Sequence, residues 1–298
     1  IVANTIAPKK KTPKSTGPSN QMDLFGQPAG LLEIESSSNL LGKETINTIK
    51  HTYHLVDTPS SREQLIEKLK KQKEFCFDTE TDSLEAIHAN LVGISFAYEK
   101  GKAYYVPVSL DFQEAKTLIS EFKELLESDV IVKIGQNIKY DMVVLKKYDI
   151  NVGLPLFDTM IAHYLIEPDM RHNMNFLASS YLNYEPIEIE SLIGKKGKKQ
   201  KTMADLQPKD IVEYACEDAD ITLQLKQLFE PILKENEATE LFETVEMPLI
   251  HVLATMEANG IQLDVKALED ISVELEKEIK VLEEKILSLI HISEPTRL

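Results

Sequence analysis

Residues 75–84, with the sequence Phe-Cys-Phe-Asp-Thr-Glu-Thr-Asp-Ser-Leu, constrain this chain more than any other stretch. Apolar and β-prone residues lead into two carboxylates, Asp78 and Glu80, which are two positions apart. Because successive side chains of a strand alternate between faces, these carboxylates should project from one face. Like charges held side by side repel, and hard divalent cations such as magnesium prefer carboxylate oxygens. The stretch predicts half of a metal site at the end of a buried strand; the alternative is a solvated strand end.

Two more pairs of polar residues occur at helical spacing later in the chain. Asn137 and Asp141 follow a short apolar strand and should share one face of a helix that Asn137 caps. Tyr214 and Asp218 are also four residues apart, whereas Asp220 should point to the other side of the same helix. Each pair alone is also compatible with an ordinary helix.

From residue 51 the pattern is that of an α/β protein with a mixed sheet flanked by helices. We expect strands over 53–56, 75–80, 91–98, 102–108 and 130–134. We expect helices over 61–71, 114–126, 138–148, 160–165, 208–229, 246–259 and 265–286. Asp158 should cap the helix over 160–165 rather than take part in chemistry.

Composition narrows the function classes. The 298 residues can form one or two domains, and no apolar run is long enough to span a bilayer, which argues against a membrane protein. Cys76 and Cys216 suit buried thiols of a protein in the reducing cytoplasm. The net charge of -16 argues against a protein that coats polyanions, but it permits a local basic patch. The lysine-rich run over 194–201 fits either a solvated loop or a segment that steers phosphates.

Residues 1–50 have the composition of a flexible linker. Within them, the segment Gln-Met-Asp-Leu-Phe over 21–25 resembles the pentapeptide with which bacterial replication and repair proteins hold the sliding clamp. Gln21, Leu24 and Phe25 are the candidate clamp-binding residues, and the alternative is a hydrophobic tether to the chain's own domain. At the other end, residues 287–298 resemble a translated sequencing-library adapter, and we expect them to be an artefact.

The three constellations together predict one catalytic site. Four converging carboxylates can hold two divalent ions, Mg²⁺ or Mn²⁺, about 4 Å apart, as in enzymes that cleave phosphodiesters. One ion would lower the pKa of a bound water, and the other would stabilise the leaving 3′ oxygen. A tyrosine one turn from a ligand could orient the attacking water.

At these residues the chain resembles the 3′-5′ exonuclease domain of bacterial DNA polymerase I, which has a ribonuclease H-like fold. The resemblance covers about residues 51–286 and implies a proofreading exonuclease acting on the single-stranded 3′ end of DNA. It implies the following roles at matched positions: Asp78, Glu80, Asp141 and Asp218 as metal ligands, Tyr214 positioning the water, Leu84 packing against the terminal base, and Asn137 and Arg171 contacting the strand.

The resemblance also implies how the chain is divided. We expect an exonuclease domain over 51–240 and the truncated helical start of a polymerase thumb over 241–286, without the polymerase active site. The parent would be a monomeric, cytoplasmic DNA-directed DNA polymerase of replication and repair. Two alternatives remain open: an exonuclease like ribonuclease D that acts on RNA, and a catalytically silent scaffold that binds DNA or the clamp.

Overall fold

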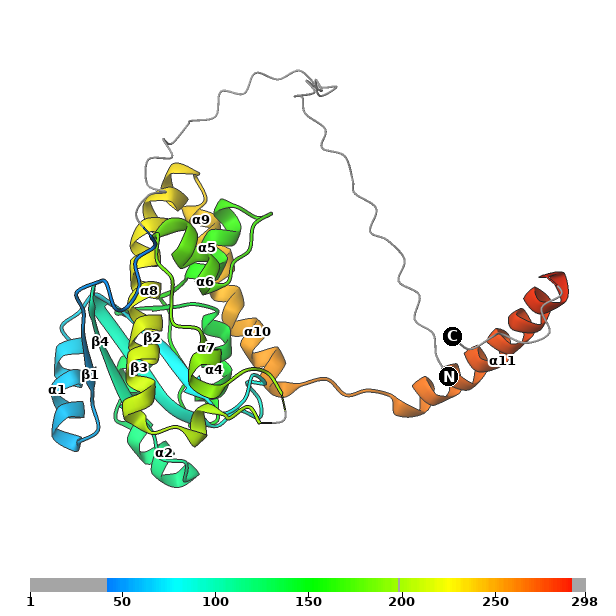
Figure 1. The fold of residues 1–298 in the computed structure, drawn as a ribbon, viewed down its shortest axis with the longest axis horizontal. Helices are drawn as coiled ribbons and strands as arrows, with labels where there is room; N and C mark the ends of the chain where they lie inside the picture. Colours follow the sequence, from blue (N-terminus) through cyan, green and yellow to red (C-terminus); the bar gives the residue numbers. More distant parts are fainter. Residues whose placement is uncertain (1–41, 198, 291–298) are drawn as a thin grey trace, which may run out of the picture. The chain divides into compact units, whose positions relative to one another are not determined.

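A six-stranded mixed sheet is the centre of the structure, a computed structural model that describes residues 42–197 and 199–290 (Figure 1). In the described residues the strands are β1 (Thr52–Leu55), β2 (Glu74–Thr81), β3 (Leu91–Glu99), β4 (Lys102–Pro107), β5 (Val132–Gly135) and β6 (Leu156–Asp158), in the order β1-β4-β3-β2-β5-β6. β2 pairs antiparallel with β3 and parallel with β5. The predicted fold class, an α/β mixed sheet with flanking helices, is confirmed.

The helices of the described residues were mostly anticipated in position. They are α1 (Pro59–Leu69), α2 (Phe112–Ser120), α3 (Lys123–Leu126), α4 (Ile138–Lys146), α5 (Thr159–Ile166), α6 (Met174–Tyr181), α7 (Ile189–Ile193), η1 (Met203–Asp205), α8 (Pro208–Glu235), α9 (Thr239–Leu241), η2 (Phe242–Glu246), α10 (Met247–Asn259) and α11 (Val265–Ile290). No helix in the described part of the chain is both long enough and apolar enough to cross a bilayer.

Strand β2 owes its central place to its sequence. Phe75, Cys76 and Phe77 are all fully buried, so side chains on both faces of the strand contact the core, as expected of an interior strand. Cys216 is buried as well, and the prediction of two buried free thiols is confirmed. The strand then ends in polar residues beside β3, where Glu80 lies opposite Gly93.

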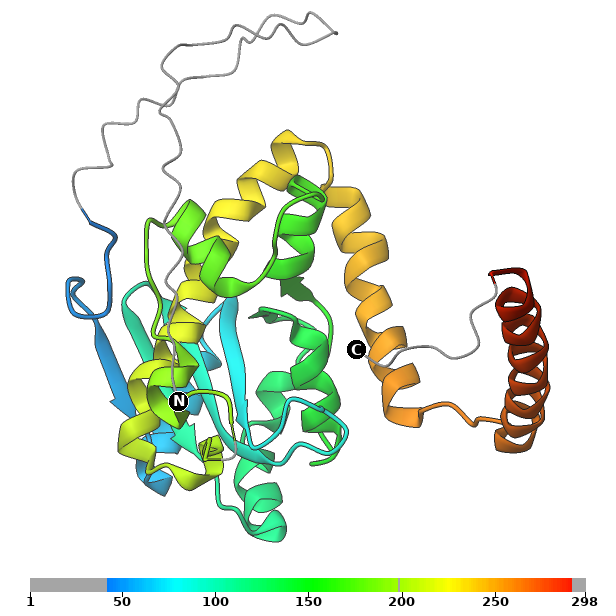
Figure 2. The same cartoon turned by 45° about the vertical axis from the view of Figure 1, so that its right-hand side comes forward.

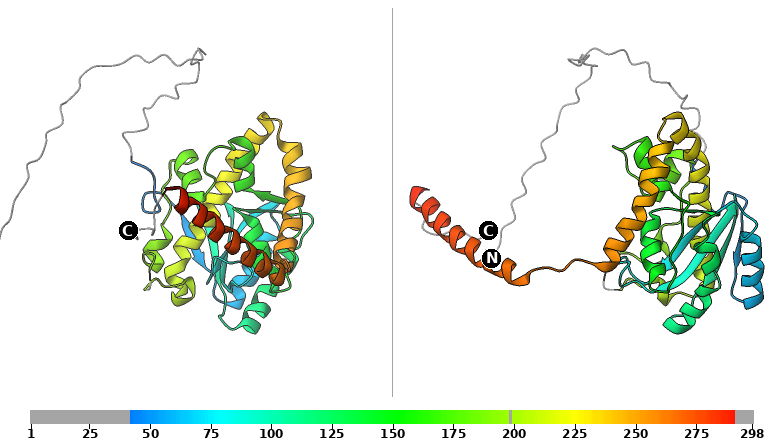
Figure 3. Two further views of the ribbon diagram at one scale, coloured as in Figure 1. Left: turned by 90° about the vertical axis from the view of Figure 1, so that its right-hand side faces the viewer. Right: turned by 180° about the vertical axis from the view of Figure 1, so that it is seen from behind.

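Helix α8 crosses one face of the sheet and contacts strands β1 to β5 (Figure 2). Asp220 anchors this helix, since its carboxylate accepts hydrogen bonds from the Tyr53 hydroxyl and the Gly101 backbone N–H, both at 2.9 Å. The prediction that Asp220 points away from Tyr214 and Asp218 is therefore consistent with its structural contacts. Helix α10 lies beside α4, seen from two further sides in Figure 3.

Several local expectations were wrong or incomplete. The single helix predicted over 114–126 is divided into α2 and α3, because the chain turns at Phe122 to bury that ring against Phe96. The sequence did not reveal β6, which has only three residues, or the short helices α6 and α7. Within the predicted linker, the Glu44 N–H donates to the Asn183 carbonyl oxygen at 3.0 Å.

Asp158 caps two helices at once. Its carboxylate accepts from the backbone N–H groups of Met160 and Ile161 at the start of α5, and from that of Ile138, at 2.8 Å, at the start of α4. Asn137 occupies the predicted N-cap position of α4, but its side chain makes no capping hydrogen bond. The Asn137 backbone N–H is a fourth donor to the Asp158 carboxylate, at 3.4 Å. Burial raises the pKa of Asp158, and the four N–H donors oppose that shift.

Asp158→Ala should therefore lower the free energy of unfolding by about 2 kcal/mol, roughly twice the loss of a single cap. The matched control is Asp111→Ala, which removes an exposed carboxylate that caps α2 alone and should cost about 1 kcal/mol. Urea unfolding followed by circular dichroism measures both. Equal losses in the two variants would contradict the double-capping role.

Candidate active site

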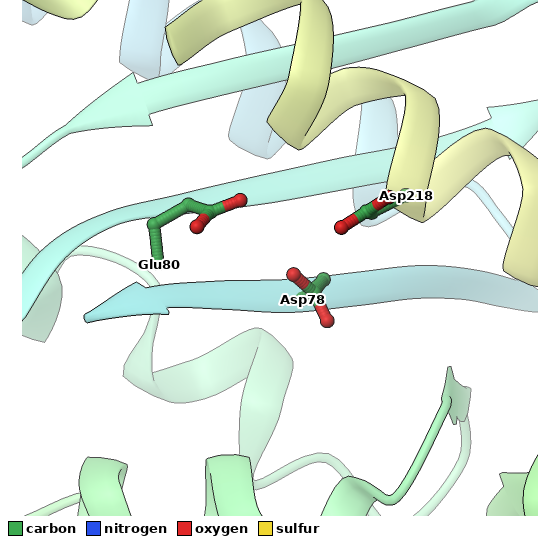
Figure 4. Close-up of side chains that lie close together, drawn as sticks. All are labelled: Asp78, Glu80 and Asp218. Atoms are coloured by element: carbon green, nitrogen blue, oxygen red, sulfur yellow. The ribbon is translucent and has the colours of Figure 1, made fainter. Parts of the chain in front are cut away.

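Three carboxylates that are distant in sequence meet at the polar end of β2. One oxygen from each of Asp78, Glu80 and Asp218 lies within 4.8 Å of the others. Asp78 and Glu80 project from β2, and Asp218 reaches them from α8, so the three groups face one space (Figure 4). The prediction that Asp78 and Glu80 share a face of the strand is confirmed by this geometry.

Asp141, the fourth predicted carboxylate, is held by the residue between the other two. Its Oδ1 accepts from the Thr79 backbone N–H at 3.0 Å and from the Thr79 hydroxyl at 2.5 Å. Thr79 lies between Asp78 and Glu80 on β2, and α4 brings Asp141 within hydrogen-bond distance of its backbone N–H and hydroxyl. Asp141 is not part of the group of three, but it lines the same cleft.

The four carboxylates form one electrostatic unit. Burial raises the pKa of Asp78 and Glu80 well above their usual values, and Asp141 adds to both shifts through its charge. Burial and the charge of Glu80 also raise the pKa of Asp218. Burial raises the pKa of Asp141 to about 7, although the hydrogen bonds from Thr79 oppose that shift. Concentrated negative charge of this kind is unfavourable in the absence of a compensating cation.

Two buried carboxylate oxygens of the cluster have no hydrogen-bond partner in the described part of the chain, which bears on whether a metal ion fits this site. Glu80 Oε1 and Asp218 Oδ1 are buried, and no hydrogen-bond donor of the described residues reaches them. A buried carboxylate oxygen without a donor costs free energy, and a divalent cation removes that cost. The donor set consists of hard oxygen atoms, the kind that Mg²⁺ and Mn²⁺ prefer. The residues present therefore fit a divalent metal.

The cluster opens into a cleft of about 570 Å³. The cleft brings together all the matched carboxylates with three other predicted site residues: Tyr214, Leu84 and Asn137. Leu84 is 94% exposed, so its side chain is available for contact with a ligand. Asn137 has a left-handed backbone conformation, with φ 57°, at the first turn of α4. The burial of Tyr214 and the charges of Asp218 and Glu80 raise the pKa of its hydroxyl.

Tyr140 supports the cleft, although the sequence analysis did not single it out. Its hydroxyl donates to the Ser83 carbonyl oxygen at 2.5 Å and lies 2.5 Å from the Thr81 hydroxyl. These contacts fix the segment that leads from Glu80 to Leu84. The sequence also assigned no role to Thr79. Both residues are directly adjacent in sequence to a predicted metal ligand, and this position is the one sequence feature that could have indicated them.

The remaining predicted site residues lie elsewhere. Arg171 is exposed in the loop between α5 and α6, and it is not among the described residues that line the cleft. Gln21, Leu24 and Phe25, the predicted clamp-binding residues, lie outside the described residues. Their roles stay predictions.

Comparisons with known proteins show which family the chain resembles in sequence. A family model described as "3′-5′ exonuclease" matches residues 53–234. The DNA polymerase I of Borreliella burgdorferi is 37% identical over 266 residues, which cover 88% of this chain and 29% of that protein. The chain therefore spans less than a third of the length of this relative.

Solved structures support the fold at lower identity. The polymerase domain of Pol1 from M. smegmatis, in complex with DNA primer-template and dNTP, matches 80% of this chain and 37% of its own, with a TM-score of 0.64 and 20% identity. Brucella melitensis NrnC bound to pGG matches 71% of this chain and 95% of its own, with a TM-score of 0.55 and 21% identity. At these identities the likeness concerns the fold alone.

Proposed function

The chain belongs to the 3′-5′ exonuclease family found in DNA polymerase I, and from this premise we propose that it shortens DNA from the 3′ end in a metal-dependent hydrolysis. Water attacks the terminal phosphodiester, the bond between phosphorus and the 3′ oxygen of the preceding nucleotide breaks, and a nucleoside 5′-monophosphate leaves. The observation that carries this proposal is the cluster of Asp78, Glu80 and Asp218 with its unpartnered buried oxygens.

In this proposal Asp78, Glu80, Asp141 and Asp218 hold two divalent ions, Mg²⁺ or Mn²⁺. When bound, the ions would supply Lewis acidity for activating the attacking water and for stabilising charge on the phosphate and the leaving oxygen. Asp78 lies within the group of three carboxylates, and the nearby charge of Asp141 adds to the burial that raises its pKa. Thr79 orients Asp141 by donating two hydrogen bonds.

We assign Tyr214 the task of orienting the attacking water. Because the pKa of its hydroxyl is raised, the group keeps its proton at neutral pH and can donate a hydrogen bond. It is therefore a hydrogen-bond donor rather than a general base. Leu84, Asn137 and Arg171 would contact the strand itself: Leu84 as an exposed apolar surface for the terminal base, and the two polar side chains at its phosphates or sugars.

Tyr214→Phe should lower kcat by about 10- to 100-fold, the effect of losing one positioning hydrogen bond. KM for an oligonucleotide should stay within about twofold, because the ring and its packing remain. The pH dependence gives a second test, since the raised pKa predicts no fall in rate from tyrosine ionisation between pH 7 and 9. A variant as fast as the wild type would remove Tyr214 from the mechanism.

A 5′-labelled single-stranded DNA tests the proposed function directly. The 298-residue chain should produce a ladder of products shortened by one nucleotide at a time in the presence of Mg²⁺ or Mn²⁺. The control is Asp78→Ala/Glu80→Ala, in which the ladder should disappear. Immediate release of the label as a mononucleotide would indicate the opposite polarity and contradict the proposal.

An RNA oligonucleotide of the same sequence and length, tested in the same assay, distinguishes the proposed DNA exonuclease from the ribonuclease D-like alternative. Preference for DNA is expected, because the match to DNA polymerase I extends over 266 residues and so beyond the exonuclease region of 53–234. The silent scaffold would bind DNA without shortening it. Participation in a complete DNA polymerase of replication and repair, and attachment to a sliding clamp through Gln21, Leu24 and Phe25, are further proposals for the longer protein.

A further inference from the structure

The proposed catalytic cleft carries far more negative than positive charge. Among the described residues that line it are five carboxylates (Asp78, Glu80, Asp82, Asp141 and Asp218), and Lys201 is the single basic one. Two divalent ions would roughly neutralise this excess of negative charge. They would supply no further positive charge to attract the phosphates of the part of the strand that lies outside the site. A single strand, with one charge per nucleotide, needs cations along its path.

The lysine-rich loop between α7 and η1 leaves the cleft and returns to it. Ile193, before the loop, and Gln200 and Lys201, at its end, all line the cleft. The Lys201 N–H donates to the Ile193 carbonyl oxygen at 2.9 Å, which closes the loop at its base. Gly194 permits the turn with φ 87°, a conformation that residues with a side chain rarely adopt. Both ends of the loop therefore lie at the edge of the cleft.

The described lysines of this loop are exposed and form no salt bridge with other described residues. Lys195, Lys196, Lys199 and Lys201 are all exposed. Within the described parts of the chain, none of the salt bridges involves them. The nearby Asp205 accepts hydrogen bonds from the backbone N–H and hydroxyl of Thr202; the charge of Lys201 also lowers its pKa, but the two side chains form no salt bridge. Their ammonium groups are thus available to a ligand in a protein with a net charge of -16.

We propose that these four residues form a lysine rim that binds the sugar-phosphate backbone of the single strand upstream of the scissile bond. The ligand class is a single-stranded polyanion, because lysines recognise phosphate charge without reading bases. The rim would supply affinity and guide the strand, whereas the carboxylates perform the chemistry. This inference rests on the proposed function in one respect: the ligand is taken to be the DNA strand that the exonuclease would shorten.

The experiment measures binding and chemistry separately in the 298-residue chain. The rim variant is Lys195→Gln/Lys196→Gln/Lys199→Gln/Lys201→Gln. The control replaces four exposed lysines that lie outside this loop and do not line the cleft: Lys50→Gln/Lys71→Gln/Lys73→Gln/Lys100→Gln. Fluorescence anisotropy with a labelled single-stranded DNA gives Kd over a range of salt concentrations in the presence of EDTA. Hydrolysis of a small substrate, the p-nitrophenyl ester of thymidine 5′-phosphate, reports the chemistry with Mn²⁺ present.

The rim variant should bind the DNA about tenfold more weakly at low salt. The slope of log Kd against log salt should fall by about 0.7 for each phosphate that the rim no longer binds. The control variant should have the same Kd and salt slope as the wild type. Both variants should hydrolyse the small ester at the wild-type rate. A rim variant with unchanged Kd and salt slope, or one whose affinity falls no further than that of the control, overturns the lysine rim. Absence of ester hydrolysis in the wild type would instead count against the proposed function, and the binding data would still decide the rim.

Discussion

Asp218→Asn should lower the rate of nucleotide release by about 10³-fold or more, because it removes a proposed metal ligand from the point where three carboxylates meet. A loss of this size corresponds to about 4 kcal/mol of transition-state stabilisation. The same substitution should not destabilise the metal-free protein, since the native carboxylate has a buried oxygen without a donor and a raised pKa. Steady-state kinetics and thermal unfolding with EDTA measure the two effects.

Asp220→Asn provides a matched control, two residues later on the same buried helix. Its carboxylate is occupied by Tyr53 and Gly101 rather than by the cluster. We therefore expect nearly wild-type rates and a loss of about 1 to 3 kcal/mol in the free energy of unfolding. If Asp220→Asn lost activity while folded and Asp218→Asn kept it, our assignment of the two carboxylates would be wrong.

Removal of divalent metal should abolish the activity and also lower the stability of the protein. A ligand present at 100 times its Kd stabilises the folded state by about 2.7 kcal/mol. We expect a stabilisation of this order when Mg²⁺ or Mn²⁺ is added to EDTA-treated protein at pH 7.5. Thermal unfolding with each ion, and rates after readdition of metal, test this expectation.

The pH dependence of the metal effect follows from the raised pKa values. A carboxyl group whose pKa is higher in the folded state makes the folded protein bind more protons than the unfolded chain, so its contribution to stability declines as pH rises. With the pKa of Asp141 at about 7, this decline should extend from about pH 4 to about pH 7 in metal-free protein. Metal opposes the decline, so its stabilising effect should be greater at pH 7.5 than at pH 5.

The control for this prediction is Asp78→Asn/Glu80→Gln/Asp218→Asn. It should show neither stabilisation by metal nor the difference in metal effect between the two pH values. A wild-type protein that gains no stability from Mg²⁺ or Mn²⁺ at pH 7.5 would contradict the metal site.

The sequence was informative wherever backbone periodicity alone decides geometry. Two-residue alternation placed Asp78 and Glu80 on one face of β2, and helical spacing separated Asp218 from Asp220. The prediction of a mixed α/β sheet succeeded for the same reason, since it rested on long segments with a clear period. It failed where tertiary packing overrides the local pattern, as in the division of the helix at Phe122 and in the three-residue strand β6.

Long-range placement could be decided only by the tertiary structure, because no local period relates β2 to helices some 60 and 140 positions further along the chain. Packing of α8 across the sheet brings Asp218 to Asp78 and Glu80, whereas α4 carries Asp141 to Thr79 in the same cleft. Folding also gives Asp158 two helices to cap and sets Lys201 on the rim of the cleft. The sequence thus determined which residues could act together on one element, and the packing of separate elements decided which of them meet.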